Sequence, residues 1–308
     1  MDPKRKIIDM LNQAGGVVSG ETLSAELGIS RVSVWKHIKG LVQSGIPVVS
    51  SSKGYRLPRD PDSLHPWAFD AWQDRIHYFA ETTSTMDEAM ALARKGCPDF
   101  SVAVAQRQTR GRGRMKRTWL SADGGLYFTV VVRPEIPMML AGLVNLAAAI
   151  DMADLLRSMH RVDAQLKWPN DILVGNHKIC GVLSQMEAEG DQVAHMNIGI
   201  GLNVNNAPEA EEPIAVSLKT LKGRPVARRE ILVAFLDAFK RRILTFEPDK
   251  VIDQWQSRNV TLGQKVRVIT VRDRVEGTAE ALDANGGLIL RLADGSRQTV
   301  IYGDCFHR

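Results

Sequence analysis

Hydrophobic spacing in the first sixty residues predicts three short helices. Apolar residues recur at helical spacing over 7–14, 23–27 and 34–42, and glycines follow the first two stretches. Ser19 and Ser30 stand where N-caps of the second and third helices would lie. The three helices are close enough in sequence to pack around one small core.

Two short apolar runs on either side of Ser52-Lys53-Gly54 then predict a hairpin. Helix, turn, helix and hairpin is the order of a winged helix-turn-helix, and it would occupy residues 1–60. The polar residues that would contact DNA are Ser30, Arg31, Ser33, Lys36, His37 and Lys53. The alternative is a three-helix packing module with no role in DNA binding. Pro58 to Pro66 is typical of a linker.

The middle of the chain mixes helical and strand patterns, which predicts an α+β domain over 67–260. Strands are expected near 102–106, 126–132, 164–166 and 172–183, and a long helix from Ala141 to Met159. From Leu262 the period changes to two, with turns at Asp283–Gly287 and at Asp294-Gly295. Residues 261–308 are therefore expected to form a small β-barrel of five short strands, which would be similar to an SH3-like domain.

Charge and cysteine content narrow the possible partners and compartments. The net charge is +5 over 308 residues, and residues 1–60 carry nine Lys/Arg against five Asp/Glu, so the basic end favours a polyanion partner. The three cysteines are far apart, which argues against structural zinc and for a reducing, cytoplasmic location. Polar residues interrupt the most apolar run, 138–156, so a buried helix is expected and no membrane partner.

The most unusual stretch is Gly111–Arg117, which holds two glycines and four cations in seven residues. Its composition opposes burial in a strand, so it predicts a loop hung from a sheet. Glycines allow close backbone approach and guanidinium groups pair with carboxylate or phosphate oxygens. The stretch alone is equally consistent with a small anionic ligand, with non-specific nucleic-acid contact and with a solvated cluster.

Three further stretches carry polar groups at predicted strand ends. Lys167-Trp168-Pro169-Asn170-Asp171 follows a short strand, and a hairpin returns Lys178 and Gly181 towards it. The run 197–205 alternates glycine with apolar residues, which leaves room for a flat ring or a second backbone against that strand.

Together these residues resemble the biotin protein ligase family, in particular its bifunctional members that are also biotin operon repressors. The resemblance rests on Gly-Arg-Gly-Arg at 111–114, Lys-Trp-Pro-Asn-Asp at 167–171, Lys-Ile-Cys-Gly at 178–181 and Gly-Leu-Asn-Val-Asn at 201–205. It implies ATP-dependent formation of biotinyl-5'-AMP, with Mg²⁺ bound to phosphate oxygens and no intrinsic metal site. Biotin then passes to a lysine of a biotin carboxyl carrier protein domain. Operator DNA is the second implied partner, bound by a homodimer that biotinyl-AMP promotes.

The resemblance also assigns roles to individual residues. Catalysis would involve Arg114, Lys167, Lys178 and Asp171; biotin and the adenylate would contact Ser84, Thr85, Met86, Gln108, Gly111, Arg112, Gly113, Arg114, Lys178 and Gly181; and Asn170 and Asn203 would lie near the nucleotide and Mg²⁺. The chemistry suits these types, because two anions must meet and cations must offset their repulsion. Asp171 would orient the acceptor amine or take its proton, although an acid beside Pro-Asn can also just close its own turn.

The chain departs from the family pattern at two places. Family loops continue with Arg-Gly-Arg where this chain has Met115-Lys116-Arg117, and Met86 stands where asparagine is common. The alternatives to a bifunctional ligase are a ligase without regulatory DNA binding, a lipoate or octanoate transfer enzyme of related fold, and a transcription factor that only senses a metabolite.

Overall fold

A computed structural model describes residues 3–58, 60–270 and 273–307 of the chain. The chain divides into two compact units, Met1–Asp74 and Arg75–Arg308, which are described separately. The first unit therefore continues beyond residue 60, the boundary predicted from the sequence, and includes the segment predicted as a linker. Arg59 of that segment lies outside the described residues.

The first unit is the predicted sequence of helices and hairpin. Its elements are α1 (Pro3–Ala14), α2 (Gly20–Leu27), α3 (Arg31–Gln43), β1 (Val49–Ser51) and β2 (Gly54–Arg56). Ser19 and Ser30 cap α2 and α3 as predicted, each accepting a hydrogen bond from a backbone amide three residues later.

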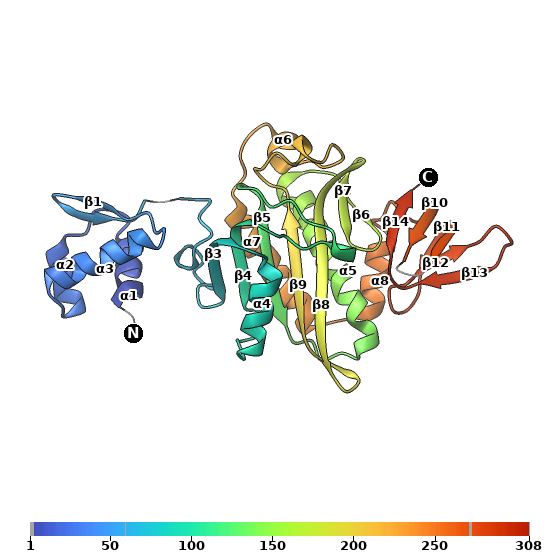
Figure 1. The fold of residues 1–308 in the computed structure, drawn as a ribbon, viewed down its shortest axis with the longest axis horizontal. Helices are drawn as coiled ribbons and strands as arrows, with labels where there is room; N and C mark the ends of the chain where they lie inside the picture. The colour runs from blue at the N-terminus through green and yellow to red at the C-terminus, as the bar shows by residue number, and fades with distance from the viewer. Residues whose placement is uncertain (1–2, 59, 271–272, 308) are drawn as a thin grey trace. The chain divides into compact units, whose positions relative to one another are not determined.

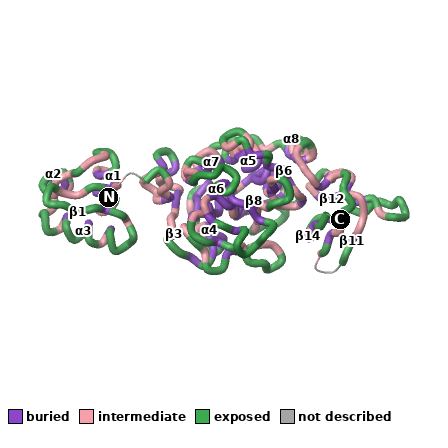
Figure 2. Tube along the Cα trace, turned by 90° about the horizontal axis from the view of Figure 1, so that it is seen from above, coloured by how far each residue is buried: buried purple, intermediate pink, exposed green. Residues whose placement is uncertain are grey.

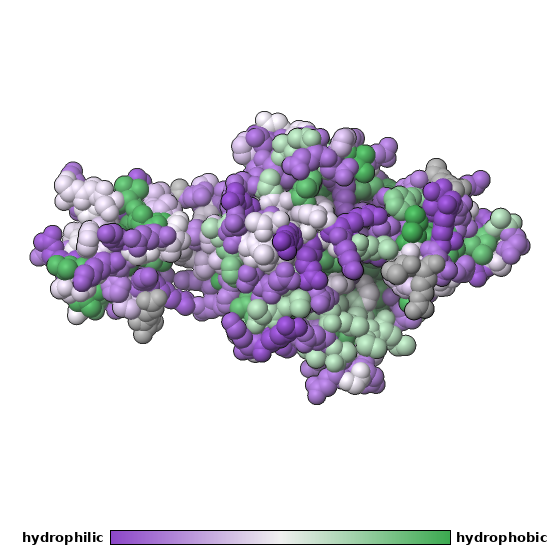
Figure 3. All heavy atoms as spheres, viewed as in Figure 1, coloured by the Kyte–Doolittle hydropathy of each residue, from purple (hydrophilic) through white to green (hydrophobic). Residues whose placement is uncertain are grey.

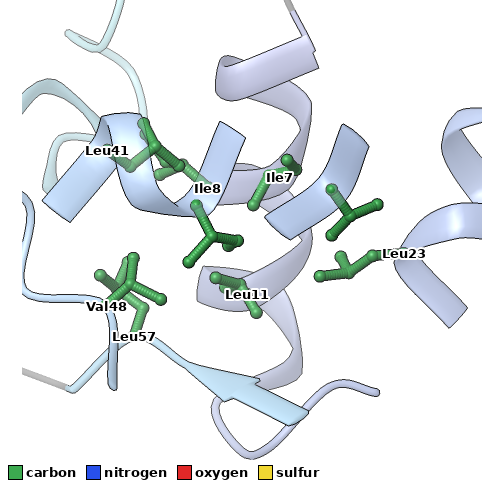
Figure 4. Close-up of a cluster of buried hydrophobic side chains, with 9 residues drawn as sticks. Ile7, Ile8, Leu11, Leu23, Leu41, Val48 and Leu57 are labelled. Atoms are coloured by element: carbon green, nitrogen blue, oxygen red, sulfur yellow. The ribbon is translucent and has the colours of Figure 1, made fainter. Parts of the chain in front are cut away.

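One apolar cluster holds this unit together. Figure 4 shows Ile7, Ile8 and Leu11 of α1 pointing toward Leu23 of α2 and Leu41 of α3. Val48 and Leu57, at the two ends of the hairpin, close the cluster. The hairpin is therefore fixed against the helices by buried side chains as well as by backbone pairing.

The second unit is built on a seven-stranded sheet in the order β3-β4-β5-β9-β8-β7-β6. Only β3 and β4 run parallel to each other; every other neighbouring pair is antiparallel. The strands are β3 (Ile76–Thr82), β4 (Val102–Gln108), β5 (Leu126–Val132), β6 (Ala164–Lys167), β7 (Asp171–Val174), β8 (His177–Glu189) and β9 (Gln192–Leu202). Figure 1 shows β8 and β9 as the long central pair.

Helices cover both faces of this sheet (Figures 1 and 2). They are α4 (Thr85–Arg94), α5 (Ala141–His160), α6 (Leu218–Lys222), α7 (Arg228–Leu244) and α8 (Pro248–Gln256). On β5, Phe128 meets the ring of Phe235 in α7, whereas Thr129 bonds to Thr85 at the start of α4. Because neighbouring strand residues face opposite ways, α4 and α7 lie on opposite sides of the sheet.

The long helix α5 is the core helix that the apolar run predicted, and it starts at the predicted residue. The segment Met138–His160 is long and apolar enough to cross a membrane, but 72% of its most apolar window is buried inside the protein. That burial is the position of a helix in a folded core. Polar residues dominate the molecular face shown in Figure 3.

The C-terminal domain is a five-stranded antiparallel sheet in the order β13-β12-β11-β10-β14. Its strands are β10 (Lys265–Ile269), β11 (Arg274–Leu282), β12 (Leu288–Arg291), β13 (Arg297–Val300) and β14 (Asp304–His307). The indole of Trp168 donates a hydrogen bond to the carbonyl of Gly286 at 3.1 Å, and Thr261 accepts one from the Trp168 amide at 3.0 Å. The Lys167–Asp171 turn is therefore attached to this sheet.

Candidate active site and DNA-binding surface

A cavity of about 340 Å³ opens on the α4 side of the central sheet. The predicted site residues that line it are Ser84, Thr85, Met86, Gln108, Arg112, Gly113, Arg114, Lys167, Asn170, Asp171, Lys178, Gly181 and Asn203. Gly111, the first residue of the loop, is predicted as a site residue but is not among the residues that line the cavity; a Cβ atom there would stand 2.3 Å from the Trp119 carbonyl oxygen. Predicted residues from six separate segments of the chain thus converge on one cavity.

Glycines form the floor of the cavity. Gly181 and Gly201 are paired across β8 and β9, and the Trp119 indole lies over both. A Cβ atom on Gly201 would be 2.4 Å from the indole nitrogen, and one on Gly181 would be 3.0 Å from the ring. Any side chain there would displace the tryptophan, so the alternation of glycine with apolar residues in β9 has a steric reason.

Hydroxyl and amide groups form a chain of hydrogen bonds at one wall. Thr129 donates to the Thr85 hydroxyl at 2.9 Å, Thr85 donates to the Gln108 side-chain oxygen at 3.1 Å, and the Gln108 amide donates to Ser121 at 2.8 Å. Ser84 is the N-cap of α4 and its hydroxyl accepts from the Met86 amide. This wall offers both donors and acceptors to a ligand.

Met86 is buried, and its sulfur packs against β9. A Cβ atom on Gly199 would lie 2.7 Å from that sulfur. At this position, where asparagine is common in the family, the chain therefore makes an apolar contact and has no side-chain amide to hydrogen-bond a ligand.

The wall opposite carries charge. The Lys178 ammonium lies 2.6 Å from Oδ1 of Asp171, outside the alignment of a hydrogen bond, and 5.2 Å from the centre of the Trp119 ring. Both charged side chains are about one quarter to one third exposed, at 31% and 23%. The pair is therefore a partly buried electrostatic contact that an incoming anion can reach from the cavity.

The arginine loop folds as a tight turn over the cavity. The Trp119 amide donates to the Gly111 carbonyl and the Gly113 amide donates to the Arg117 carbonyl, both at 2.8 Å. Arg114 donates to the Asn170 side-chain oxygen at 3.4 Å, and burial lowers the pKa of its guanidinium, which remains charged. Arg112 instead pairs with Asp87 of α4 at 2.8 Å, where both groups are substantially exposed.

Several cavity residues were not predicted from the sequence. They include Trp119 and Leu120 after the loop, Ile214 and Ala215 before α6, and Asp304, Cys305 and Phe306 on β14. Trp119 lies two residues after the end of the arginine loop and was the one with a local signal, a large aromatic residue close to cations. The others come from segments with no motif.

The thiols of Cys305, which lines the cavity, and of Cys180, which lies next to the lining residue Gly181, are not activated as nucleophiles. Burial raises the pKa of the Cys305 thiol to about 11 and that of the Cys180 thiol further, so both remain protonated. Among residues 3–58, 60–270 and 273–307, no group of three His, Cys, Asp or Glu side chains is placed to hold a metal. A divalent cation would need oxygen ligands from its substrate, which is how Mg²⁺ binds with nucleotides.

The first unit has a concave surface of its own, about 390 Å³ in volume. It is formed by the starts of α2 and α3 and by the hairpin tip, and it is lined by Arg31, Trp35, Lys53 and Tyr55 among others. Of the remaining residues predicted to contact DNA, Ser30 and Lys36 are exposed, and Ser33 and His37 are partly buried. Ser30 also caps α3.

Comparison with known proteins identifies the family. Family models match the HTH domain at residues 3–56, the Biotin/lipoate A/B protein ligase family at 78–203 and the Biotin protein ligase C terminal domain at 261–308. The chain is 32% identical to the bifunctional ligase/repressor BirA of Bacillus subtilis over 96% of each chain. The chain belongs to the bifunctional biotin ligase/repressor family.

Two other relatives cover mainly the second unit. A biotin–[acetyl-CoA-carboxylase] ligase of Paracoccus denitrificans is 32% identical over 74% of this chain and 98% of its own. The biotin protein ligase of Aquifex aeolicus in complex with biotin and ATP matches with a TM-score of 0.64 at 26% identity, over 76% of this chain and 98% of its own. The biotin ligase fold therefore accounts for the cavity-bearing unit, and the helix-turn-helix repressor domain for the other.

Proposed function

We propose that the cavity makes biotinyl-5'-AMP from biotin and ATP with release of pyrophosphate, and that biotin then passes to a lysine of a carboxyl carrier protein domain with release of AMP. The observation that carries the proposal is the cavity itself, where Arg114, Lys167 and Lys178 surround a floor of glycines. A carboxylate and a triphosphate repel each other, and fixed cations around a flat floor offset that repulsion while the rings lie against the sheet.

Each wall then has a task. Thr85 and Gln108 exchange their mutual hydrogen bonds for bonds to the ureido ring, which has donors and acceptors of its own. Lys178 turns from Asp171 to the biotin carboxylate and to the phosphate that is attacked, and Arg114 covers the same phosphate from the loop. Negative charge gathers on the oxygens around that phosphorus in the transition state, so these cations act most strongly there.

The nucleotide lies toward the Lys167–Asp171 turn. Asn170 and Asn203 both line the cavity there. Their side-chain oxygens accept hydrogen bonds from Arg114 and Asn206, and the second lone pair of each would accept one from the water shell of a Mg²⁺ that ATP brings. Bound Mg²⁺ neutralises phosphate charge. Once Lys178 has moved to the anion, Asp171 is released to orient the acceptor amine or to take its proton.

The first unit acts as a repressor of biotin genes that responds to biotinyl-AMP. Arg31 and Lys53 reach the phosphates or bases of an operator from helix and wing, with Ser30, Ser33, Lys36 and His37 beside them. The chain dimerises when the adenylate is bound. A dimer presents two helix-turn-helix units, which can contact two half-sites of an operator at once. We place the protein in the cytoplasm, where its thiols, acceptor and DNA are found.

Pyrophosphate exchange into ATP tests the enzymatic proposal. Purified protein with Mg²⁺ and ATP should catalyse exchange when biotin is added, and not with lipoate or without acid. Exchange with lipoate alone would replace the proposal with a lipoate-activating enzyme.

Titration of the protein against promoter DNA of its own biotin genes tests the regulatory proposal. Binding should strengthen in the presence of biotinyl-AMP, together with a monomer-to-dimer shift in sedimentation. Equal, weak binding to every DNA fragment would leave a ligase without regulatory DNA binding.

A further inference from the structure

The three arginines of the loop each meet a different part of the second unit. Arg112 pairs with Asp87 on α4, Arg114 bonds to Asn170 in the turn after β6, and Arg117 pairs with Asp304 at the start of β14. The third contact connects the loop to the C-terminal domain, 187 residues further along the chain. The Gly-Arg-Gly-Arg motif at 111–114 does not include Arg117 and so does not predict the contact between Arg117 and Asp304.

Asp304 is the fixed partner of the Arg117–Asp304 pair. Its side chain is only 15% exposed and lines the cavity, whereas the Arg117 side chain is 61% exposed. The backbone of Asp304 pairs with Ile269 of β10, so the carboxylate belongs to an ordered sheet. The arginine belongs to a loop that is held by turn hydrogen bonds and an isolated bridge between Arg112 and Thr118, and not by pairing within a sheet, so the ion pair restrains the loop more than the sheet.

The turn transmits this restraint to the cavity. The Arg117 amide donates to the Arg114 carbonyl at 3.0 Å, and the Arg117 carbonyl accepts from the Gly113 amide at 2.8 Å. Because these hydrogen bonds connect the two residues, a contact that fixes the position of Arg117 also fixes the position of Arg114, whose side chain lines the cavity. Asp304 also acts electrostatically on the Arg114 guanidinium.

We propose that the Arg117–Asp304 pair is a latch by which the C-terminal domain holds the arginine loop closed over the cavity. Arg117 and Asp304 are positioning residues: they act through Arg114 and keep the bound acyl-adenylate from escaping before its transfer. The inference rests on the proposed function and adds two residues, one on the C-terminal domain, that govern retention of the intermediate.

A different explanation makes an opposite prediction. A carboxylate that lines an anion-binding cavity repels phosphate, and Arg117 would then serve only to cancel that charge. On that explanation Asp304→Asn strengthens ATP binding while Arg117→Gln weakens it. On the latch explanation both substitutions open the loop and change adenylate retention in the same direction.

The experiment compares four variants of the full-length protein with wild type. They are Asp304→Asn, Arg117→Gln, their double variant, and the charge exchange Arg117→Asp with Asp304→Arg. Glu280→Gln is the matched control, because Glu280 pairs with Arg291 and Arg297 on the same C-terminal sheet and does not line the cavity. Dissociation of preformed biotinyl-AMP is followed after a chase with unlabelled biotin, together with KM for ATP and kcat of exchange.

Both single variants should speed adenylate dissociation about two- to fivefold, the range that a partly exposed ion pair provides. The double variant should be no faster than either single one, the exchanged pair should recover part of the retention, and Glu280→Gln should match wild type. The latch is overturned if Asp304→Asn leaves dissociation unchanged, or if the two single variants shift KM for ATP in opposite directions with no change in dissociation.

Trypsin cleavage separates this inference from the proposed function. The loop contains Arg112, Arg114, Lys116 and Arg117, so its opening exposes cleavage sites even in protein without ligand. Asp304→Asn should be cut faster within 112–117 than wild type or Glu280→Gln. Equal cleavage rates would refute the latch, whereas absence of biotin-dependent exchange in wild type would refute only the proposed function.

Discussion

Replacement of Lys178 by methionine should damage adenylate formation far more than biotin binding. Methionine keeps the length and apolar stem of lysine, so its packing beside Trp119 is retained and the charge alone is lost. The change also leaves the Asp171 carboxylate without the ammonium that now lies 2.6 Å from it. A negative group would then face the carboxylate and phosphates of the substrates.

The structure sets the size of the effect. Two unit charges about 4 Å apart interact by about 4 kcal/mol at an effective dielectric of about 20. Lys178 is 31% exposed, so solvent screening reduces this to about 2–3 kcal/mol, or about a hundredfold in rate. Adding Asp171→Asn removes the uncompensated carboxylate and should restore about tenfold of the loss, because part of the penalty is repulsion.

Biotin affinity by calorimetry and exchange rates at saturating biotin provide the comparison. Lys265→Met, an exposed lysine of β10 that does not line the cavity, is the control and should behave as wild type. The double variant is compared only in adenylate formation, since Asp171 also has a proposed role in transfer. Equal losses in biotin affinity and exchange rate would show that Lys178 acts in ground-state binding alone, and no recovery in the double variant would show that Asp171 repulsion is unimportant.

Three further predictions concern other parts of the chain. Gly201→Ala should weaken biotin binding about tenfold or more, because its Cβ would displace the Trp119 indole. The Cβ of Gly199→Ala would approach the end of the Met86 side chain, which can move, so biotin affinity should fall less. Equal losses of biotin affinity by calorimetry would contradict this. Lys116 has a left-handed backbone (φ 63°), which glycine adopts easily and a β-branched residue does not. Lys116→Val should therefore speed adenylate dissociation several-fold, whereas Lys116→Gly should change it by less than about twofold. Equal dissociation rates for the two variants would contradict the turn seen in the loop. Burial lowers the pKa of His65 from 6.5 to about 4, so the protonated unfolded state is favoured as the pH falls between these values. In denaturant titrations of the first unit, the free energy of unfolding of wild type should fall by about 1–2 kcal/mol more than that of His65→Gln between pH 7 and pH 5. Equal decreases in the two proteins would refute this prediction.

Local signals in the sequence were sufficient for most of the fold. Serine caps at 19 and 30, glycine stops and apolar spacing located the three N-terminal helices, because these signals act within a few residues. The glycines of β9 and the Gly111–Arg117 stretch likewise located the cavity, since their unusual composition has a local steric or electrostatic cause. Helix α8 and strand β14 were not predicted: each is short, and β14 follows a bend at residues 301–303 and shows little alternation.

The missing parts of the site are long-range contacts. Arg117 and Asp304 are separated by 187 positions, and no periodicity connects a loop arginine to one aspartate among many. Arg242 near the end of α7 is a similar case: its local position suits the helix dipole, but the structure pairs it with the buried Asp151 of α5 at 2.6 Å. Such pairs depend on how elements pack, which sequence spacing does not encode.

The central claim is that this cavity activates biotin and delivers it to a protein lysine. Mass spectrometry of a carboxyl carrier domain after incubation with the full-length protein, biotin, ATP and Mg²⁺ tests that claim most directly. We predict one added biotin on the acceptor lysine with wild type, loss of the addition when ATP is omitted, and a strongly reduced rate with Lys178→Met. An unmodified carrier domain in the complete reaction, or lipoylation of that lysine when lipoate replaces biotin, would contradict it.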